Sequence, residues 1–266
     1  MTIFNHYLNQ WHLVPDGDPI ITRSSQLLPV IYKGESAMLK IAISEEEHRG
    51  ASLMVWWNGE GAARVFKHED DAILMERAIG NRSLVSMTKT GQDDEASKII
   101  CEVVTRLHAK KQKPLPTALV PLSIWFRSLH LAAKEQGGIF TQASLIAEEL
   151  LNNPQDIVVL HGDIHHQNIL DSGQHGWIAI DPKGLLGERS FDYANIFCNP
   201  DWYVATSPGR LTRQATIIAK TAGLERSRLI KWIFAYAGLS AAWSLQDGDS
   251  PDLALAIANL SKAEIE

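Results

Sequence analysis

Short apolar runs rich in β-forming residues occur along the first 78 residues, separated by polar turn residues, and this pattern is typical of β-strands. The runs that predict strands are 20–22, 27–32, 37–43, 62–66 and 72–76. Ser44 is followed by three acidic residues, which favours a helix start because the serine caps the helix and the acids suit its dipole. The helix is expected to continue to Trp57. The N-terminal third is therefore predicted to hold five strands and one helix.

Beyond residue 78 the apolar spacing becomes helical. The stretch 90–93 resembles a capping box, and apolar residues then recur at helical spacing through 99–107. Further helices are predicted over 121–136, over 141–151 and from 211 to the end, with a β segment before the last of these. The pattern predicts an α+β fold with a small β-rich lobe over 1–78 and a larger, mostly helical lobe over 79–266.

Apolar runs flank the most informative polar stretch, which extends from His161 to Asn168. Asp163 and Asn168 are five positions apart, and the next apolar run, 177–180, leads into Asp181. Kinase catalytic loops carry an aspartate and an asparagine at this spacing and are followed by a metal-binding aspartate. We therefore expect Asp163 to be the base that accepts the proton of an acceptor hydroxyl. Asn168 and Asp181 would supply hard oxygen ligands for Mg²⁺, which offsets the charge of the phosphates.

Lys40 lies within the apolar run 37–42, and a lysine that points inward there needs an anionic partner. Kinases place such a lysine on a strand, where it contacts the phosphates of ATP and pairs with a helix glutamate. Three glutamates follow Ser44, and the first two suit the N-terminal turn of the helix. Glu47 is therefore the expected partner of Lys40, and a solvent-exposed lysine on an edge strand is the alternative.

Two further segments are expected to contact ATP. The strand 72–76 leads out of the small lobe, so that backbone groups of Glu76 and Ala78 would pair with the edge of the adenine. Ser24 and Ser25 lie in a loop where kinases place glycines over the phosphates, and their hydroxyl and amide groups would serve instead. The chain has no G-x-x-x-x-G-K-[ST] sequence, which excludes a P-loop NTPase.

Composition narrows the class of partner. The chain has 31 acidic and 25 basic residues and a net charge of −6, which disfavours a nucleic-acid binder and suits a cationic small molecule. No secretory signal is visible at the N-terminus, and no uncharged apolar run is long enough to span a membrane. We expect a cytoplasmic monomer or weak dimer with no membrane or nucleic-acid partner.

Three other functions remain open on these residues alone. Histidines cluster near the loop, at positions 161, 165, 166 and 175, so a transition-metal site is an alternative to a magnesium site. A catalytically silent nucleotide-binding protein would explain the glycine-poor phosphate loop. A metal-dependent phosphoesterase is the third, although the second G-D and N-H elements typical of that class are not evident.

The loop sequence H-G-D-x-H-x-x-N is typical of the aminoglycoside phosphotransferase branch of the kinase-like fold, and residues 161–168 fit it at every fixed position. The I-D-x-x sequence of that family fits residues 180–183. The chain resembles still more closely the streptomycin 6-kinases, also grouped as aminoglycoside/hydroxyurea antibiotic resistance kinases. The segments that carry this resemblance, in the same order over nearly the whole chain, are 56–65, 74–78, 91–96, 184–189, 191–195 and 238–243.

This resemblance implies a two-lobed, protein-kinase-like fold. It also implies ATP- and Mg²⁺-dependent transfer of the γ-phosphoryl group to a hydroxyl of streptomycin, at the 6-position, giving antibiotic resistance. Another acceptor, such as hydroxyurea or a metabolite, is the alternative, and so is an inactive member of the fold. Streptomycin is a polycation with guanidinium groups, so its pocket should be acidic. The candidate acids are Glu188, Asp201, Asp247 and Asp249.

The resemblance also suggests which residues support the loop. An aspartate after the metal-binding one commonly braces the catalytic loop in kinase-like folds, and Asp192 would have this role. His161 and His165 are expected to shape the loop through hydrogen bonds to the backbone rather than to bind a metal. Three aromatic residues would either flank the acceptor sugar or belong to the core: Trp202, Tyr203 and Trp243.

Overall fold

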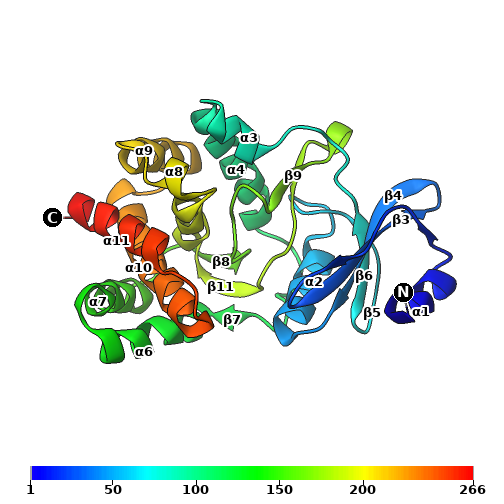
Figure 1. The fold of residues 1–266 in the computed structure, drawn as a ribbon, viewed down its shortest axis with the longest axis horizontal. Helices are drawn as coiled ribbons and strands as arrows, with labels where there is room; N and C mark the ends of the chain where they lie inside the picture. The colour runs from blue at the N-terminus through cyan, green and yellow to red at the C-terminus, as the bar shows by residue number, and fades with distance from the viewer. Residues whose placement is uncertain (1, 266) are drawn as a thin grey trace.

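The computed structural model describes residues 2–265 and shows two lobes side by side (Figure 1). The N lobe, residues 2–76, holds the main sheet, and the C lobe, residues 84–265, is mostly helical. Residues 77–83 connect the two lobes. The predicted α+β class and the two-lobed arrangement are confirmed. None of the helices within residues 2–265 has the length and apolarity that crossing a lipid bilayer requires.

The N lobe is an antiparallel sheet with one helix on each face. Its strands are β1 Val14–Pro15, β2 Ile20–Ile21, β3 Ser25–Tyr32, β4 Glu35–Ala42, β5 Val65–Glu69 and β6 Ala72–Glu76. They are ordered β1-β3-β4-β6-β5, and β2 pairs with β3. Helix α1, Thr2–Gln10, packs on one face and α2, Glu45–Trp57, on the other. The strands expected over 20–22, 27–32, 37–43 and 72–76 and helix α2 are present, whereas the strand expected over 62–66 begins only at Val65, as β5. Helix α1 was missed because it has no acidic residue in its first turn and no basic residue in its last, and β1 because it is two residues long.

Alternation along β4 decides which way Lys40 points. Leu39 and Ile41 are buried in the core that α1 covers, at 0% and 3% exposed. Lys40 therefore lies on the opposite face, towards α2, because successive side chains of a strand alternate between the two faces. Its partner across β6 is Ile73, which belongs to the core beneath α2.

Helix α2 starts as the sequence predicts. The hydroxyl of Ser44 caps it by accepting a hydrogen bond of 3.3 Å from the amide of Glu47. Its buried face includes Glu47, Gly50 and Trp57. Gly50 lies so close to the C lobe that an added Cβ would be 2.3 Å from the carbonyl oxygen of Pro182. This glycine permits α2 to dock directly onto the segment that follows Asp181.

Helices form most of the C lobe. They are α3 Leu84–Lys89, α4 Asp93–His108, α5 Leu122–Trp125, α6 Arg127–Gln136, α7 Gly138–Asn152, α8 Trp202–Ala205, α9 Arg210–Ala222, α10 Arg226–Asp247 and α11 Asp252–Ile265, with 3₁₀ turns η1 Gly173–His175 and η2 Arg189–Cys198. The single helix predicted over 121–136 is divided at Phe126. The capping box predicted at 90–93 is wrong, because Gln92 is the N-cap and its side chain makes no capping bond.

Two small β structures of the C lobe carry the polar loop. Strands β7 Val120–Pro121, β11 Leu185–Glu188 and β8 Ile157–Leu160 form a three-stranded sheet in the order β7-β11-β8. Strands β9 Ile169–Asp171 and β10 Trp177–Ala179 form an antiparallel hairpin. The loop 161–168 connects β8 to β9, and Asp181 follows β10, in the order that the sequence predicts.

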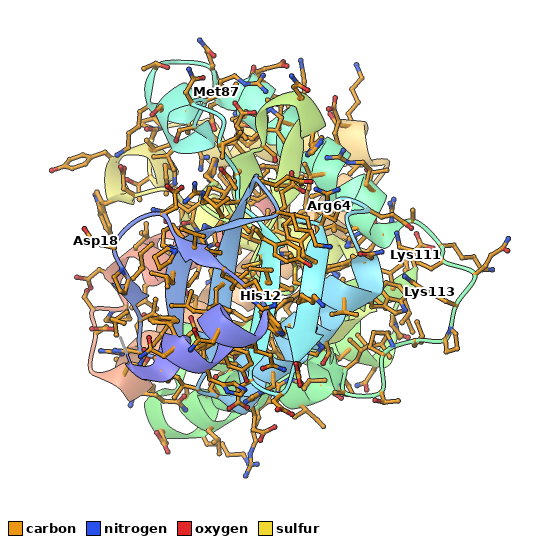
Figure 2. All side chains as sticks on the ribbon, turned by 90° about the vertical axis from the view of Figure 1, so that its right-hand side faces the viewer. His12, Asp18, Arg64, Met87, Lys111 and Lys113 are labelled. Atoms are coloured by element: carbon orange, nitrogen blue, oxygen red, sulfur yellow. The ribbon has the colours of Figure 1, made fainter. Side chains whose placement is uncertain are left out.

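Side-chain contacts tie the lobes together around the connecting segment. Arg82 donates two hydrogen bonds to Asp171, of 2.8 and 3.0 Å. The amide of Gly80 bonds to the carbonyl of the same aspartate. On the far edge, Lys111 pairs with Glu60, and Lys113 lies 5.2 Å over the ring of Trp56. Figure 2 shows both lysines on the loop that leads from α4 to β7, beside the sheet.

We expect Gly50→Ala to destabilise the fold by about 1–3 kcal/mol, because the new methyl group would overlap the carbonyl of Pro182. Helix propensity alone favours alanine here by about 1 kcal/mol, so the two effects have opposite signs. Denaturant unfolding measures the difference. Ser52→Ala, on the exposed face of α2, is the matched control and should change stability by less than about 0.5 kcal/mol. A stabilised Gly50→Ala protein would show that α2 does not dock on Pro182.

Candidate active site

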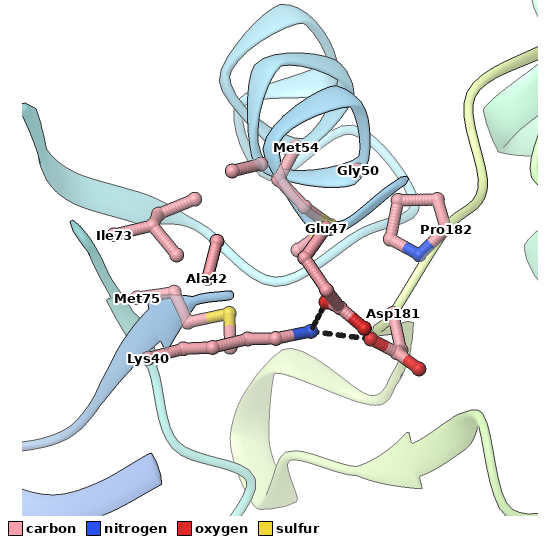
Figure 3. A pocket seen from close by; sticks show the side chains of 10 residues that line it. Lys40, Ala42, Glu47, Gly50, Met54, Ile73, Met75, Asp181 and Pro182 are labelled. Carbon is pink, nitrogen blue, oxygen red and sulfur yellow. Dashed lines mark hydrogen bonds and ion pairs between the residues drawn. The ribbon is translucent and has the colours of Figure 1, made fainter. Parts of the chain in front are cut away.

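The lobes meet at a cluster of charged side chains. Figure 3 shows the ammonium group of Lys40 between the carboxylates of Glu47 and Asp181, and it forms an ion pair with each. Lys40 and Glu47 are 12% and 5% exposed. Of the three glutamates that begin α2, the structure thus places Glu47 against Lys40. The hydrophobic residues around this cluster, such as Met54 and Met75, keep bulk water away and strengthen the attraction.

Asp181 has an unusual backbone conformation. Its φ is +62°, in the left-handed region that residues other than glycine seldom adopt. Strain of this kind costs about 1–3 kcal/mol and collects at functional sites, where the surroundings enforce it. Burial would raise the pKa of Asp181, but the positive charges of Lys40 and Lys183 outweigh it and lower the pKa to about 2. The side chain is therefore a carboxylate at neutral pH.

The turn between β2 and β3 covers this cluster. The hydroxyl of Ser24 donates a 2.7 Å hydrogen bond to Glu47, which places Ser24 beside the partner of Lys40. Ser25 was expected at the phosphates, and the structure corrects this. It is 3% exposed, its amide bonds to the hydroxyl of Thr22, and its own hydroxyl lies 3.1 Å from the same group. Its polar groups thus hold the turn together and do not face the nucleotide side.

Glu76 and Ala78 lie where β6 leaves the N lobe. The amide of Glu76 already bonds to the carbonyl of Arg64 at 2.8 Å, so it is not available to adenine. Its carboxylate accepts hydrogen bonds from Ser172 and His175 of the C lobe. The carbonyl of Glu76 and the amide of Ala78 remain the predicted contacts with the base.

Asp163 is held by two asparagine side chains. The amide group of Asn168 donates to Asp163 Oδ2 at 3.1 Å and to its carbonyl at 2.9 Å. The amide group of Asn195 donates to Oδ1 at 2.8 Å. Both carboxylate oxygens thus have a fixed direction. The side chain of Asp163 is 26% exposed, so it remains accessible to a bound molecule.

Asn195 is a site residue that sequence reasoning missed. It lies three positions after Asp192 in the 3₁₀ stretch η2, and residues three apart in a 3₁₀ helix share one face. Both side chains therefore point to the loop. Asn199 donates to the side-chain oxygen of Asn195 at 3.0 Å, which turns the amide nitrogen of Asn195 towards Asp163. The signal available in the sequence was this spacing of three from the predicted brace.

Asp192 bonds to the loop backbone. It is 1% exposed and accepts hydrogen bonds from the amides of His161 and Gly162, at 2.9 and 2.7 Å, and from the ring of His108. Buried amides that lack a regular partner would each cost about 1–3 kcal/mol, so Asp192 replaces the bonds that a strand would supply. This contact is the one expected of a brace.

His161 links the two halves of the site. Its Nε2 lies 2.8 Å from the carbonyl oxygen of Ile180, and its Nδ1 accepts from the amide of Asp163. The ring thus donates through Nε2, which fixes the tautomer. It stacks on Trp57 of α2 with a centroid separation of 6.1 Å. Burial lowers the pKa of His161, more than the nearby carboxylates raise it, so the ring is neutral.

The remaining histidines are also outside any metal cluster. Nδ1 of His165 accepts from the amide of Gln167, and burial lowers the pKa of His165. His166 is 2% exposed and lies within the C lobe. Within residues 2–265 no three side chains of the His, Cys, Asp or Glu type come together as metal ligands would. The transition-metal alternative therefore has no ligand set in this part of the chain.

Lys183 also belongs to the site, although sequence reasoning gave it no role. Its ammonium lies 3.4 Å from Asp181 and 3.3 Å from Glu46. Burial lowers the pKa of Lys183, but the carboxylates of Asp181, Asp163, Glu46 and Glu47 outweigh this effect and raise it above its ordinary value. Its position two residues after Asp181 and just before a glycine was the available signal.

A cleft of about 620 Å³ opens in front of Asp163, between α2 and the helices of the C lobe. Three carboxylates line it, from three separate parts of the chain: Glu46, Asp163 and Asp247. Two cations, Lys183 and Arg127, lie among them. Of the four acids predicted to bind an acceptor, Asp247 is the one that lines this cleft.

Aromatic side chains form one wall of the cleft. Trp125 and Trp243 meet edge to face, with centroids 5.4 Å apart, and Tyr236 packs against Trp243 at 6.3 Å. Burial and the charge of Asp163 raise the pKa of Tyr236, so its phenol stays protonated. Trp202 and Tyr203, also considered as flanking aromatics, lie elsewhere on α8 and are exposed.

The other three predicted acids have different surroundings. Glu188 is 2% exposed and accepts hydrogen bonds from Arg228, Trp232 and the amide of Gln155. This set lowers its pKa against the effect of burial, so it is a structural ion pair and the prediction was wrong. Asp201 caps α8 and pairs with Lys89. Asp249 lies in the exposed turn after α10, outside the residues that line the cleft.

We expect Glu188→Gln to lower the free energy of unfolding by about 3–5 kcal/mol, because Arg228 would keep a buried charge without its partner. Denaturant unfolding provides the measurement. The control is Glu149→Gln, whose exposed ion pair with Lys231 should contribute at most about 1 kcal/mol. Similar losses in the two variants would contradict the assignment of Glu188 to the core.

A family model described as aminoglycoside/hydroxyurea antibiotic resistance kinase matches residues 10–248. The chain is 48% identical over 246 residues to streptomycin 3''-kinase from Klebsiella pneumoniae, covering 91% of this chain and 92% of that protein. It is 27% identical to streptomycin 6-kinase from Streptomyces griseus, covering 91% of this chain and 81% of that protein.

Among solved structures, the fold is similar to a thermostable mutant of aminoglycoside phosphotransferase APH(4)-Ia in ternary complex with ADP and hygromycin B. The TM-score is 0.69 at 13% identity, over 100% of this chain and 98% of that one. The protein-kinase-like fold and the family resemblance indicated by the sequence motifs are thereby confirmed.

Proposed function

The chain belongs to the aminoglycoside/hydroxyurea antibiotic resistance kinase family, and from this premise we propose that it transfers the γ-phosphoryl group of ATP to a hydroxyl of streptomycin, which would give resistance to the antibiotic. One observation carries the proposal. Asp163 faces an acidic cleft while Lys40, Glu47 and Asp181 form a charge cluster at the junction of the lobes. These are the groups that phosphoryl transfer to an alcohol requires.

Asp163 is the proposed base. Its oxygens are directed by Asn168 and Asn195, so the carboxylate is oriented before any acceptor arrives. An acceptor hydroxyl that donates to Asp163 is aligned for attack, and its proton passes to the carboxylate as the new bond to phosphorus forms. Asn195 is a positioning residue in this scheme, because it acts through Asp163.

Asn168 and Asp181 are the proposed magnesium ligands, and their chemistry fits. Asn168 uses its amide nitrogen on Asp163, which leaves the amide oxygen for a cation. Asp181 contributes a carboxylate, and both are the hard oxygen donors that Mg²⁺ prefers. When bound, the ion would offset the negative charge of the phosphates.

Lys40 is the proposed contact of the ATP phosphates. Glu47 orients its ammonium, and Ser24 in turn orients Glu47. The carbonyl of Glu76 and the amide of Ala78 are the proposed partners of the adenine. The pair Lys40–Glu47 links α2 to the sheet, so the position of α2 sets the position of the phosphate contact.

The acceptor cleft suits streptomycin. Carboxylates such as Asp247 attract guanidinium groups, and the wall formed by Trp125, Tyr236 and Trp243 can stack on guanidinium planes or on sugar faces. The motifs of the sequence suggested the 6-hydroxyl. The greater identity to a 3''-kinase, 48% against 27%, favours the 3''-hydroxyl, and we propose that position. Hydroxyurea is the second candidate, because the family name includes it.

We expect Asp163→Asn to reduce streptomycin-dependent ADP release from ATP by at least about 10²-fold, because the base is lost. Binding of ATP should change little, since Asp163 faces the acceptor side. The measurement is Mg²⁺-dependent ADP release with and without streptomycin, together with calorimetric titration of ATP. Undiminished turnover would refute the assignment of the base. If ATP binds in the presence of magnesium but streptomycin does not stimulate ADP release, hydroxyurea is the next acceptor to test.

The modified hydroxyl can be identified from the product. The 3''-hydroxyl belongs to the amino sugar and the 6-hydroxyl to the guanidinium-bearing ring, so fragmentation in a mass spectrometer separates them. We expect the added phosphoryl mass on the amino-sugar fragment. The added phosphoryl mass on the guanidinium-bearing ring would instead indicate transfer to the 6-hydroxyl.

We expect Asp247→Asn to raise the KM for streptomycin about tenfold with a smaller effect on kcat, because it removes one carboxylate from the cleft and leaves Asp163 in place. Asp249→Asn is the matched control. It removes the same charge two residues further on, in the exposed turn, and should leave KM within about twofold. Equal effects of both variants would indicate long-range attraction rather than contact.

A further inference from the structure

Lys183 lies at the boundary between the two halves of the site. Asp181 uses one oxygen for Lys40, on the nucleotide side, and its other oxygen is 3.4 Å from Lys183. Lys183 also lines the acceptor cleft together with Asp163. Lys183 therefore lies between the cluster at Lys40 and the cleft at Asp163, beside any group that passes from one to the other.

The backbone of Lys183 is fixed to the catalytic loop. Its amide donates a 2.7 Å hydrogen bond to the carbonyl of His161. Its Cβ packs so closely on Gly162 that a side chain there would lie 3.2 Å away. On the other side, Gly184 lies against Arg49 of α2, where an added Cβ would be 3.3 Å from the Cβ of the arginine. The backbone and Cβ of Lys183 are therefore held in place by the loop on one side and by α2 on the other.

The ammonium itself has partners that a ligand can replace. Its contacts with Asp181 and Glu46, at 3.4 and 3.3 Å, are longer than the 2.7–2.9 Å of a tight charge-assisted hydrogen bond. The side chain is 16% exposed, so desolvation by a ligand costs it little. A lysine whose backbone is fixed and whose ammonium group makes only long contacts can turn towards an incoming anion.

We propose that Lys183 is a catalytic residue that contacts the oxygens of the γ-phosphoryl group while this group is transferred. The inference rests on the proposed phosphoryl transfer. The bond from γ-phosphorus to the β,γ-bridging oxygen breaks, and ADP leaves with its electron pair. The acceptor oxygen bonds to phosphorus, and its proton goes to Asp163. Lys183 stays protonated and offsets charge on the migrating group, an effect of the kind that contributes about 10²–10³ to kcat.

The competing explanation is structural. Lys183 joins Glu46 of α2 to Asp181, so it would only help to dock the lobes. A docking role predicts lower stability and weaker ATP binding in a variant, with no selective effect on the transition state. Arg127 is the other cation that lines the cleft, and it lies earlier in the chain, at the start of α6.

The test uses the full chain as wild type, Lys183→Met, Lys183→Arg and Arg127→Met. Tetrafluoroaluminate with ADP and Mg²⁺ imitates the planar phosphoryl group, and no acceptor is needed. We expect tetrafluoroaluminate, formed from added fluoride and aluminium, to tighten ADP binding at least about tenfold in the wild type, as measured by calorimetry. This tightening should be lost in Lys183→Met, partly kept in Lys183→Arg and kept in Arg127→Met. ATP affinity and the melting temperature should change little.

In turnover, we expect kcat of Lys183→Met to fall about 10²–10³-fold, with KM for both substrates within about threefold. Fluoride-dependent tightening that survives in Lys183→Met, that disappears in Arg127→Met, or that is absent from the wild type would overturn the proposal. If Lys183→Met does not fold, Lys183→Gln takes its place, because its amide can still bond to Glu46. Since the fluoride titration contains no acceptor, it stays informative even if streptomycin is not the substrate.

Discussion

The site depends on one cluster of partly buried charges, in which Asp181 of the C lobe meets Lys40 of the N lobe and Lys40 also pairs with Glu47 of α2. Charges removed from water are costly unless they are paired, so the nearly buried Lys40 and Glu47 are stabilised by this pairing, and Asp181 joins them across the lobe boundary. Asp181 adopts its left-handed backbone conformation at this same cluster. The cluster therefore fixes the relative position of sheet, helix and catalytic loop.

Close approaches of backbone make this arrangement possible. Gly50 brings α2 against Pro182, and Gly80 brings the connecting segment against Asp171. In both places an added Cβ would lie under 3 Å from a C-lobe atom. Small residues at the lobe boundary thus permit the close contact between the lobes. The charged cluster of the site requires the same close contact.

The loop 161–168 obtains its shape from side chains, because it belongs to neither a helix nor a sheet. Asp192 satisfies two of its amides, His161 connects it to the residue before Asp181, and Asn195 directs Asp163. Such a network keeps Asp163, the proposed base, oriented in the absence of ligand, and a group oriented in advance needs no reorganisation during a reaction. Much of this support comes from η2, which carries both Asp192 and Asn195.

The sequence by itself determined the local features. The apolar run 37–42 marked the strand that carries Lys40, Ser44 set the start of α2, and the spacing of Asp163 and Asn168 indicated the chemistry of the loop. These features depend on neighbours a few residues apart, which a pattern can reveal.

Only the tertiary structure decided which of several residues of the same chemical type face the site. Glu188 and Asp247 are both acids in the C-terminal half, yet one is neutralised in the core by Arg228 and the other lines the cleft. Asn195 reaches Asp163 across 32 positions, and Lys40 reaches Asp181 across 141. Contacts at such separations follow from the packing of whole elements. A residue has the same charge and size in every environment, so its type alone does not determine which of these contacts it makes.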